Sequence, residues 1–351
     1  MTREQAVHNE RESQNAASRP RSEARDSTEK VGRTPSAHLP MDTTKQPGRA
    51  VVLRRVDGVL LLDKPVGLSS NAALQLAKRM YRAEKAGHTG TLDPLAGGLL
   101  PLCFGEATKF AHMLLDADKT YVATFRLGST TSTGDAEGEV IEQSRVDISE
   151  RGLHGALQRF VGCIDQQPPR HAALKYRGRN YYEYAREGVE IPRAARAIVI
   201  HALTLEAWNP PDAVVSVRCG KGTYVRVLAE DLGRALGCGA HLAALRRLAS
   251  GGFDVGAAIG LDALAALTDA ERDARLLPVD ALLVALPRLD LDDSEAARFF
   301  QGQIVDRRGL ADGTYRVYAD GRFAGVARVN ACIARPQRLV AHRTTTESLE
   351  S

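Results

Sequence analysis

The sequence lacks the marks of membrane, disulfide-rich and zinc-binding proteins. Its 351 residues contain no uninterrupted apolar run long enough to span a bilayer. The five cysteines are scattered, with no C-x-x-C pair and no Cys/His spacing typical of a metal site. We therefore predict a reduced, cytoplasmic protein with no metal centre and no membrane partner.

A nucleotide-binding signature is also missing. No G-x-G-x-x-G stretch occurs, and CGKGT at 219–223 differs from a phosphate-binding loop, because its Lys is followed by Gly and the upstream Gly is absent. We expect no nucleotide, metal or redox cofactor. The net charge of +4 is mildly basic, which is compatible with an anionic partner without establishing one.

The first fifty residues contain few apolar side chains. Charges of both signs alternate there with Ser, Pro and Asn, so burial cannot offset the entropy of ordering. We predict a disordered N-terminal tail over 1–50. An apolar core typical of a secretory signal is absent, and the acidic residues argue against an organellar transit peptide. Met41 is an alternative translation start.

Residues 51–285 are predicted to form one mixed α/β or α+β domain without repeats. Apolar runs indicate strands and amphipathic spacing indicates helices, and Ser69 or Ser70 and Ser149 are the expected helix N-caps. The polar stretch STTSTGDAEGEV at 129–140 is expected to be a loop. The predicted strands are 56–65, 99–104, 119–128, 204–208 and 214–219, and the predicted helices are 71–83, 105–115, 149–162 and 223–237.

A second, smaller module is predicted at 286–345. A linker and a new helix occupy the region near 280–300, and Asp320-Gly321 between two alternating runs is a strong hairpin signal. About sixty residues are enough for a small β-rich domain. Residues 346–351 are left as a short C-terminal tail.

The stretch GHTGTLDP at 87–94 places Asp93 and His88 in a glycine-rich bend. An Asp before Pro often only shapes a turn, so the stretch alone leaves both a structural and a catalytic role open. Residues 170–188 interleave Arg and Lys with four tyrosines. Cations and rings together suit looped RNA, although an ordinary solvated helix and turn is an equal alternative.

Five blocks in order resemble a known family. HTGTLDPLAGGLLPLCFGEATKF, beginning at His88, resembles the signature of the TruB-type tRNA pseudouridine synthases. DKPVGLSS, DKTYVATFRLG, TSTGDAEGEV and the long block CGKGTYVRVLAEDLGRALGCGAHLAALRRL match further parts of that pattern. The resemblance is close from Val56 to Val255 and continues weakly through the C-terminal module, which resembles the PUA-like domain of bacterial members.

This resemblance implies an α+β fold with a mixed, largely antiparallel sheet flanked by helices, followed by a small PUA-like domain. It also implies isomerisation of uridine-55 in the T loop of tRNA to pseudouridine, without a cofactor. The expected partner is tRNA, held at its T loop and acceptor stem, and the expected state is a monomer.

The resemblance also assigns catalytic roles. Asp93 matches the family's catalytic aspartate, which can attack the ribose or the base or take a proton from the sugar. Tyr121 is expected to stack on the flipped uracil. Arg226 is expected to keep Asp93 ionised, since a guanidinium favours the charged carboxylate.

Further residues are expected to bind substrate. His88 matches a residue that fills the gap left in the T loop, while Lys64, Tyr224 and Leu245 are expected to lie around the target base. Residues 165–190 match a segment that closes on RNA, so we expect it to be mobile without tRNA. Its basic residues, among them Lys175, Arg177 and Arg179, predict affinity that falls with added salt.

Two alternatives remain at this stage. A tRNA-binding folding factor without catalysis would share the RNA-binding features, although the Asp93, Tyr121 and Arg226 set argues against it. A guide-RNA-dependent synthase subunit would share the aspartate loop, although LAGGLLPLCFGEATK resembles the stand-alone type. At Ala172 the family more often has a small polar residue, so that contact differs here.

Overall fold

The computed structural model describes residues 52–341. The tails predicted at 1–50 and 346–351 lie outside these residues. From Ala50 onward the chain forms one compact unit, which contains two large sheets. The helices among the described residues are all too short or too polar to cross a bilayer.

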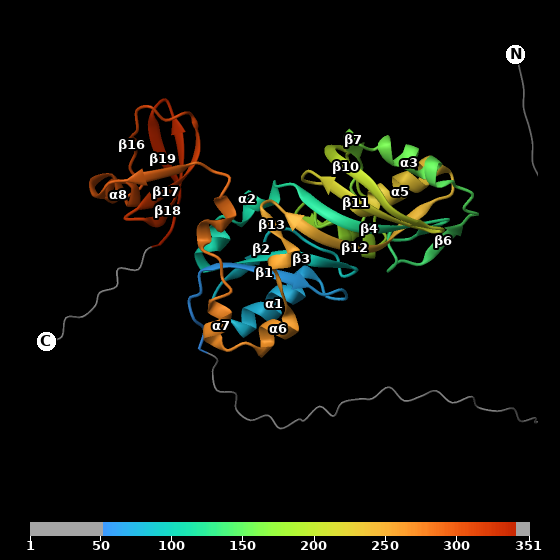
Figure 1. Cartoon of the computed structure of the whole chain (residues 1–351), viewed down its shortest axis with the longest axis horizontal. Coiled ribbons are helices and arrows are strands. Elements are labelled where there is room, and N and C mark those ends of the chain that lie inside the picture. The colour runs from blue at the N-terminus through green and yellow to red at the C-terminus, as the bar shows by residue number, and fades with distance from the viewer. Residues whose placement is uncertain (1–51, 342–351) are drawn as a thin grey trace, which may run out of the picture. The chain divides into compact units, whose positions relative to one another are not determined.

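A ten-stranded sheet forms the larger part (Figure 1). Its strand order is β14-β1-β3-β12-β4-β11-β10-β7, with β13 paired to β12 and β2 paired to β3. Only the β1–β14 and β3–β12 pairs are parallel, so the predicted mixed, largely antiparallel sheet is confirmed. The strands are β1 (Gly58–Lys64), β2 (Ala86–His88), β3 (Ala96–Phe104), β4 (Lys119–Leu127), β7 (Gly162–Gln166), β10 (Arg196–Asn209), β11 (Asp212–Cys219), β12 (Ala240–Ser250), β13 (Phe253–Asp254) and β14 (Ile259–Gly260).

Both faces of β1 and β3 are buried, which explains why β3 is apolar throughout and why β1 is apolar up to Leu62. Leu60 and Leu62 join the core formed with four helices, whereas Val59 and Leu61 pack on the opposite side. The helices of the first core are α1 (Ser70–Met80), α3 (Glu150–Gln158), α5 (Val225–Leu236) and α6 (Leu261–Ala266). The second core includes η1 (Gly105–Lys109), α2 (Ala111–Leu115) and η3 (Val279–Leu283).

Local signals in the sequence begin and end the helices as predicted. The Ser69 hydroxyl accepts from the Ala72 N–H at 3.1 Å, and the Ser149 hydroxyl accepts from the Gly152 N–H at 3.2 Å. Gly237 ends α5 with φ of 77°, a left-handed conformation that favours glycine.

Three local expectations are corrected. The single helix expected at 105–115 is divided at Phe110, whose fully buried ring packs edge-on against Phe323 at 5.4 Å. The loop expected at 129–140 contains a short ladder between β5 (Ser129–Thr131) and β6 (Val140–Gln143). The strand expected at 204–208 is the C-terminal part of the longer β10. In each case tertiary contacts override the local pattern.

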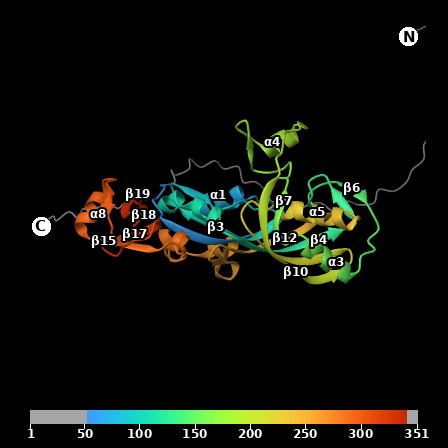
Figure 2. The same cartoon turned by 90° about the horizontal axis from the view of Figure 1, so that it is seen from above.

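An insertion joins β7 to β10. It contains a two-stranded ladder and a short helix, and Figure 2 shows this helix projecting from the sheet beside β7. Asn180 and Glu183 form a capping box at its start. The elements are β8 (Lys175–Tyr176), β9 (Arg179–Asn180) and α4 (Tyr181–Arg186).

The C-terminal module is a five-stranded sheet in the order β15-β17-β18-β19-β16. The predicted hairpin is confirmed at Asp320 and Gly321, whose φ values of 47° and 69° suit a tight turn between β17 and β18. The module agrees with the PUA-like expectation. Its elements are β15 (Arg288–Leu291), α8 (Asp293–Phe300), β16 (Val305–Asp306), β17 (Gly313–Ala319), β18 (Arg322–Asn330) and β19 (Ile333–Leu339), and the connection to it includes η2 (Val255–Ala257) and α7 (Asp269–Asp273).

Two helical glycines provide a matched test of the packing between α5 and β12. A Cβ atom added at Gly233 would lie 2.1 Å from the Ala240 nitrogen, whereas one added at Gly155 in α3 would meet nothing within 4 Å. Gly233→Ala should therefore lower the free energy of unfolding by about 2 kcal/mol or more. Gly155→Ala should raise it by about 0.5–1 kcal/mol, because alanine is the better helix former.

Urea unfolding of both variants measures these changes. A Gly233→Ala variant as stable as the native chain would contradict the close contact between helix and strand.

Candidate active site

A cleft of about 460 Å³ opens beside the glycine-rich stretch singled out in the sequence. Its walls come from the start of α1, the loop before β3, the loop between β5 and β6, the insertion and the start of α5. The lining residues are Ser69, Ser70, Asn71, His88, Thr91, Leu92, Asp93, Pro94, Thr133, Asp135, Glu137, His171, Ala173, Tyr182, Arg186 and Arg226.

The loop that carries Asp93 is anchored on both sides. The Ser70 hydroxyl donates to the Leu92 carbonyl at 2.8 Å and accepts from the Leu92 N–H at 2.7 Å. Gly90 has φ of 130°, which a residue with a side chain rarely adopts. The Ala96 N–H then donates to the Asp93 carbonyl at 3.0 Å and closes the turn. Asp93 is thereby presented at the cleft with 45% of its side chain exposed.

Arg226 lies between two carboxylates. Its side chain is only 7% exposed, and Nη2 donates to Asp93 Oδ2. Nε lies 3.2 Å from Asp135 Oδ2, although its N–H is not aligned for a hydrogen bond. Nη1 donates to the Thr133 carbonyl at 3.2 Å. One buried cation therefore orients the exposed carboxylate of Asp93 and is itself balanced by Asp135.

Asp135 is held by its own loop. The Thr133 hydroxyl donates to Asp135 Oδ1 at 2.5 Å, and the Glu137 N–H donates to the same oxygen at 3.2 Å. The Asp135 side chain is 4% exposed. Because a buried ion pair that loses one partner leaves an uncompensated charge, the three side chains are mutually dependent.

Glu137 adds a third acidic group to the cleft. Burial raises the pKa of Glu137, and the nearby charges of Asp135 and Asp93 raise it further. Three carboxylates therefore lie close together beside the cleft, and the charges of Arg226 and Lys64 act on the pKa of Glu137 in the opposite direction.

Tyr121 lies in β4 and is 8% exposed, so it does not line the open cleft. Burial raises the pKa of its hydroxyl, while the Arg247 guanidinium acts in the opposite direction. Leu245 of β12 pairs with Ala123 of β4 and Ala96 of β3. The sheet therefore brings the strand of Tyr121 and the strand that follows the Asp93 loop to either side of Leu245.

Lys64 and His88 lie close to this centre. Lys64 is fully buried at the end of β1, and Nζ donates to the Pro65 carbonyl at 2.9 Å and to the Leu68 carbonyl at 2.5 Å. Burial lowers the pKa of Lys64 to about 8, although Asp93 acts to raise it. Burial also lowers the pKa of His88, which lines the cleft with Nδ1 unpaired, so the imidazole is neutral at pH 7.

The remaining predicted residues are not all brought to the cleft. Tyr224 is half-buried at the start of α5, where its backbone exchanges hydrogen bonds with the Gln166 side chain at 2.8 and 3.1 Å. Lys175, Arg177 and Arg179 lie on the insertion outside the lining residues. The insertion contributes Tyr182 and Arg186 to the cleft instead.

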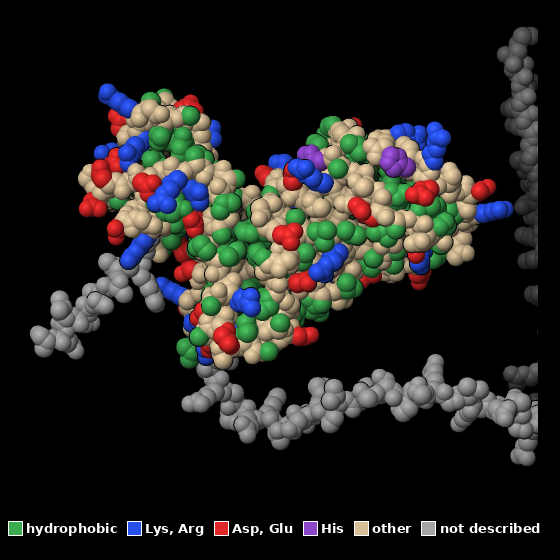
Figure 3. Space-filling view, viewed as in Figure 1, with side chains coloured by type: hydrophobic (Ala, Val, Ile, Leu, Met, Phe, Trp, Pro, Cys, Tyr) green, Lys and Arg blue, Asp and Glu red, His purple; other side chains and the backbone are tan. Residues whose placement is uncertain are grey.

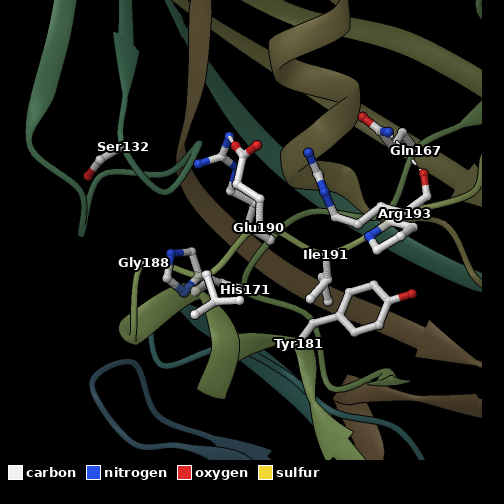
Figure 4. Close-up of a pocket in the computed structure, with 12 residues that line it drawn as sticks. Ser132, Gln167, His171, Tyr181, Gly188, Glu190, Ile191 and Arg193 are labelled. Atoms are coloured by element: carbon white, nitrogen blue, oxygen red, sulfur yellow. Dashed lines mark hydrogen bonds and ion pairs between the residues drawn. The ribbon is translucent and has the colours of Figure 1, made fainter. Parts of the chain in front are cut away.

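A second pocket of about 470 Å³ lies on the inner side of the insertion. Figure 4 shows Tyr181, Ile191 and His171 around it, with Arg193 beside Gln167. His171 lines both this pocket and the cleft. The two pockets therefore adjoin each other at His171.

Four site residues were not identified from the sequence: Asp135, Glu137, His171 and Arg247. Asp135 and Glu137 stand in TSTGDAEGEV, where two carboxylates in a glycine-containing polar stretch repeat the type of signal that marked Asp93. Arg247 stands beside Arg246 in a largely apolar strand, and a charged residue that such a strand buries usually has a partner.

Three protein-family models match most of the described residues. The model of the TruB family pseudouridylate synthase N-terminal domain matches residues 78–225. The tRNA pseudouridylate synthase B C-terminal domain matches 226–284, and the pseudouridine synthase II TruB C-terminal model matches 287–340. Together these matches contain Asp93, Tyr121 and Arg226.

Curated relatives cover most of the chain. A tRNA pseudouridine synthase B of Burkholderia mallei is 56% identical over 306 residues, which are 85% of this chain and 98% of the relative. The protein of that name from an Azoarcus species is 52% identical over 84% of this chain and 99% of the relative.

Solved structures share the fold. A structure of an H/ACA RNP bound to a substrate RNA containing 2′-deoxyuridine matches with a TM-score of 0.63 at 23% identity, over 82% of this chain and 86% of the matched chain. A Cbf5-Nop10-Gar1 complex matches with a TM-score of 0.62 at 24% identity, over 80% and 84% of the two chains.

The lowered pKa of Lys64 gives a prediction on stability. The ordinary value of 10.5 falls to about 8 in the folded chain, so between these pH values the unfolded chain binds more protons. The native chain should therefore gain about 2 kcal/mol of unfolding free energy relative to Lys64→Met between pH 7.5 and pH 10. Urea unfolding at both pH values measures the difference.

Lys85→Met is the matched control, because Lys85 is exposed. The difference in unfolding free energy between the native chain and Lys85→Met should change little between pH 7.5 and pH 10. If the difference in unfolding free energy between the native chain and Lys64→Met were also independent of pH, the amine of Lys64 would not be desolvated.

Proposed function

The chain belongs to the TruB family of pseudouridylate synthases, and we propose that it isomerises uridine-55 in the T loop of tRNA to pseudouridine. Membership of this family makes it an isomerase. One observation supports the assignment of this reaction to named residues. Asp93 lies at an open cleft, forms an ion pair with the buried Arg226 and is close to the buried Tyr121.

The reaction requires a base to leave its ribose and return through another atom. The bond from C1′ to N1 breaks, the bond from C1′ to C5 forms, N1 gains a proton and C5 loses one, so substrate and product have the same composition. Asp93 acts either as a nucleophile on the ribose or the base or as a base toward the sugar. Both routes need an ionised carboxylate, and the Asp93 carboxylate is paired with the Arg226 guanidinium.

Tyr121 and Leu245 are proposed to hold the uracil ring, with Tyr224 and Lys64 beside them. A target base inside a folded loop must be flipped out of its stack before it can react. Since Tyr121 is 8% exposed, uracil can stack on it only after neighbouring side chains move. The neutral imidazole of His88 lines the cleft, where it can fill the space that the flipped nucleotide leaves in the T loop.

The insertion at 165–190 is proposed to clamp the RNA. It covers the cleft and contributes Tyr182 and Arg186 to it, so its movement would control entry of the base. Lys175, Arg177 and Arg179 lie outside the cleft, where they suit the flanking phosphates. Arg179 is paired with Glu187 in the free chain, and RNA would have to compete for it.

The catalytic domain is proposed to span 51–285 and the PUA-like RNA-binding domain 286–345, with the acceptor stem on the latter. Its β18 and β19 carry exposed arginines at 322, 328, 335 and 338. Figure 3 shows basic side chains on the face of this module that is in view. We propose that the chain acts on tRNA as a monomer.

The two alternatives have less support. A binding factor without catalysis would not need the buried cation that pairs with Asp93. The structural matches to guide-RNA complexes are only 23–24% identical and show the fold alone, whereas the curated relatives at 52–56% identity are tRNA pseudouridine synthase B proteins.

Release of tritium from tRNA labelled at C5 of uracil tests the function. The native chain should release the T-loop label, because C5 loses its hydrogen in the reaction. Asp93→Asn should bind tRNA within about threefold of the native affinity and release label at least about 10³-fold more slowly, since the amide is neither nucleophile nor base.

Asp212→Asn is the control, because Asp212 is bound by Arg126 at 2.7–2.8 Å away from the cleft. It should keep the native rate. A native chain that binds tRNA without releasing label would replace the synthase proposal with the binding-factor alternative.

A further inference from the structure

We propose that Arg247 is a positioning residue for the isomerisation, and that it acts by fixing the hydroxyl of Tyr121 and the loop that carries Asp93. This inference rests on the proposed function. Arg247 lines neither pocket and takes no direct part in breaking or forming the glycosidic bond, so the proposed role is one of positioning.

The fold places Arg247 at the junction of three strands. It lies in β12, directly opposite Tyr121 of β4 in an antiparallel pair and beside Gly98 of β3 in a parallel pair. Cross-strand partners project from the same face of a sheet, so the guanidinium is directed toward the phenol. Arg247 is 1% exposed and is the largest fully buried side chain of the described residues.

Its hydrogen bonds join the parts of the candidate site. Nε donates to the Leu99 carbonyl at 2.7 Å, and Nη2 donates to the Gly90 carbonyl at 3.3 Å. The guanidinium also belongs to the residue directly opposite Tyr121 in the β12–β4 pair, and its charge acts on the Tyr121 hydroxyl. A single side chain thus connects the ring proposed to hold uracil with the loop that ends at Asp93.

Two glycines lie next to Arg247. A Cβ atom at Gly98 would lie 2.3 Å from the Arg247 carbonyl oxygen, so this glycine lets β3 approach the backbone of β12 closely. A Cβ atom at Gly90 would make only ordinary contact with Nη1 at 3.6 Å. Gly90 is favoured by its φ of 130°, which places its carbonyl where Nη2 of Arg247 donates to it.

Stability alone is a poor explanation for the buried cation. Among residues 52–341, no carboxylate lies within ion-pair distance of Arg247, and burial lowers its pKa. A buried charge without an opposite partner lowers the free energy of unfolding, and a neutral apolar side chain at this position would avoid that loss. The contacts with Tyr121 and with the Gly90 carbonyl give the charge a function that an apolar residue lacks.

The chemistry of arginine sets the direction of the proton on Tyr121. Arginine has only donors, so a guanidinium that approaches the Tyr121 hydroxyl can only donate to it, and the phenolic proton must then point elsewhere. The positive charge also opposes the rise in the pKa of Tyr121 that burial causes. Arg247 therefore makes the Tyr121 hydroxyl a stronger proton donor. It also directs that proton toward the uracil ring that stacks on Tyr121.

A double-mutant cycle tests whether Arg247 acts through Tyr121. Single-turnover tritium release should fall about 30-fold or more in Arg247→Met, with tRNA affinity within about threefold of native. In the Tyr121→Phe background the same change should lower the rate by no more than about threefold, because the hydroxyl it orients is already gone. Arg247→Lys, which keeps the charge without the planar fork, should recover part of the rate.

Arg246→Met is the matched control. Arg246 is the preceding residue of β12, and it pairs with Asp63 at 2.8 Å outside the cleft. Its rate should stay within about twofold of native. If Arg247→Met shows no cooperative unfolding transition and so is not folded, Arg247→Lys replaces it in the double-mutant cycle.

Carbon-13 NMR of protein labelled at tyrosine Cζ gives a readout that does not depend on activity. The Tyr121 resonance should move in Arg247→Met and Arg247→Lys and stay in place in Arg246→Met. Equal losses of rate in both Tyr121 backgrounds, or an unmoved Tyr121 resonance, would overturn the proposal. If the native chain released no tritium, the proposed function would fail and the resonance alone would decide whether Arg247 fixes Tyr121.

Discussion

The candidate site depends on one buried cation held between two carboxylates. Arg226 is 7% exposed and contacts Asp93, which faces the cleft, and Asp135, which does not. Without Asp135 the guanidinium of Arg226 would lose the carboxylate that holds it on the side away from Asp93. Without Arg226 the carboxylates of Asp93 and Asp135 would repel each other at a partly buried site. The arrangement pairs Asp93 with a buried cation while leaving 45% of its side chain exposed.

The fold supplies this interaction from parts that are far apart in the sequence. Asp93 comes from the loop before β3, Asp135 from the connection after β5, and Arg226 from the first turn of α5. β12 lies between β3 and β4, so Arg247 reaches both the Asp93 loop and Tyr121. Two buried cations thus lie in this region: Arg226 pairs with Asp93, and Arg247 is proposed to orient Tyr121.

The sequence predicted those features that depend on local chemistry. The caps at Ser69 and Ser149, the end of α5 at Gly237 and the Asp320-Gly321 hairpin follow from short-range rules. The roles of Asp93 and Arg226 came from a family resemblance, and their ion pair agrees with it. Asp135 and Arg247 could not be found this way, because their importance arises from contacts across 91 and 126 residues with Arg226 and Tyr121, as their positions show. Phe110 divides an expected helix for the same reason, since its partner Phe323 belongs to another module.

The most direct test of the account is a structure of Asp93→Asn bound to a T stem-loop RNA that contains the unmodified target uridine. The account predicts that the uridine is flipped into the cleft, with its ribose against residue 93, its uracil on the ring of Tyr121, and His88 in the space that the nucleotide has left. A target uridine that remains stacked in the T loop, or that is bound away from Arg226 and Tyr121, would contradict it.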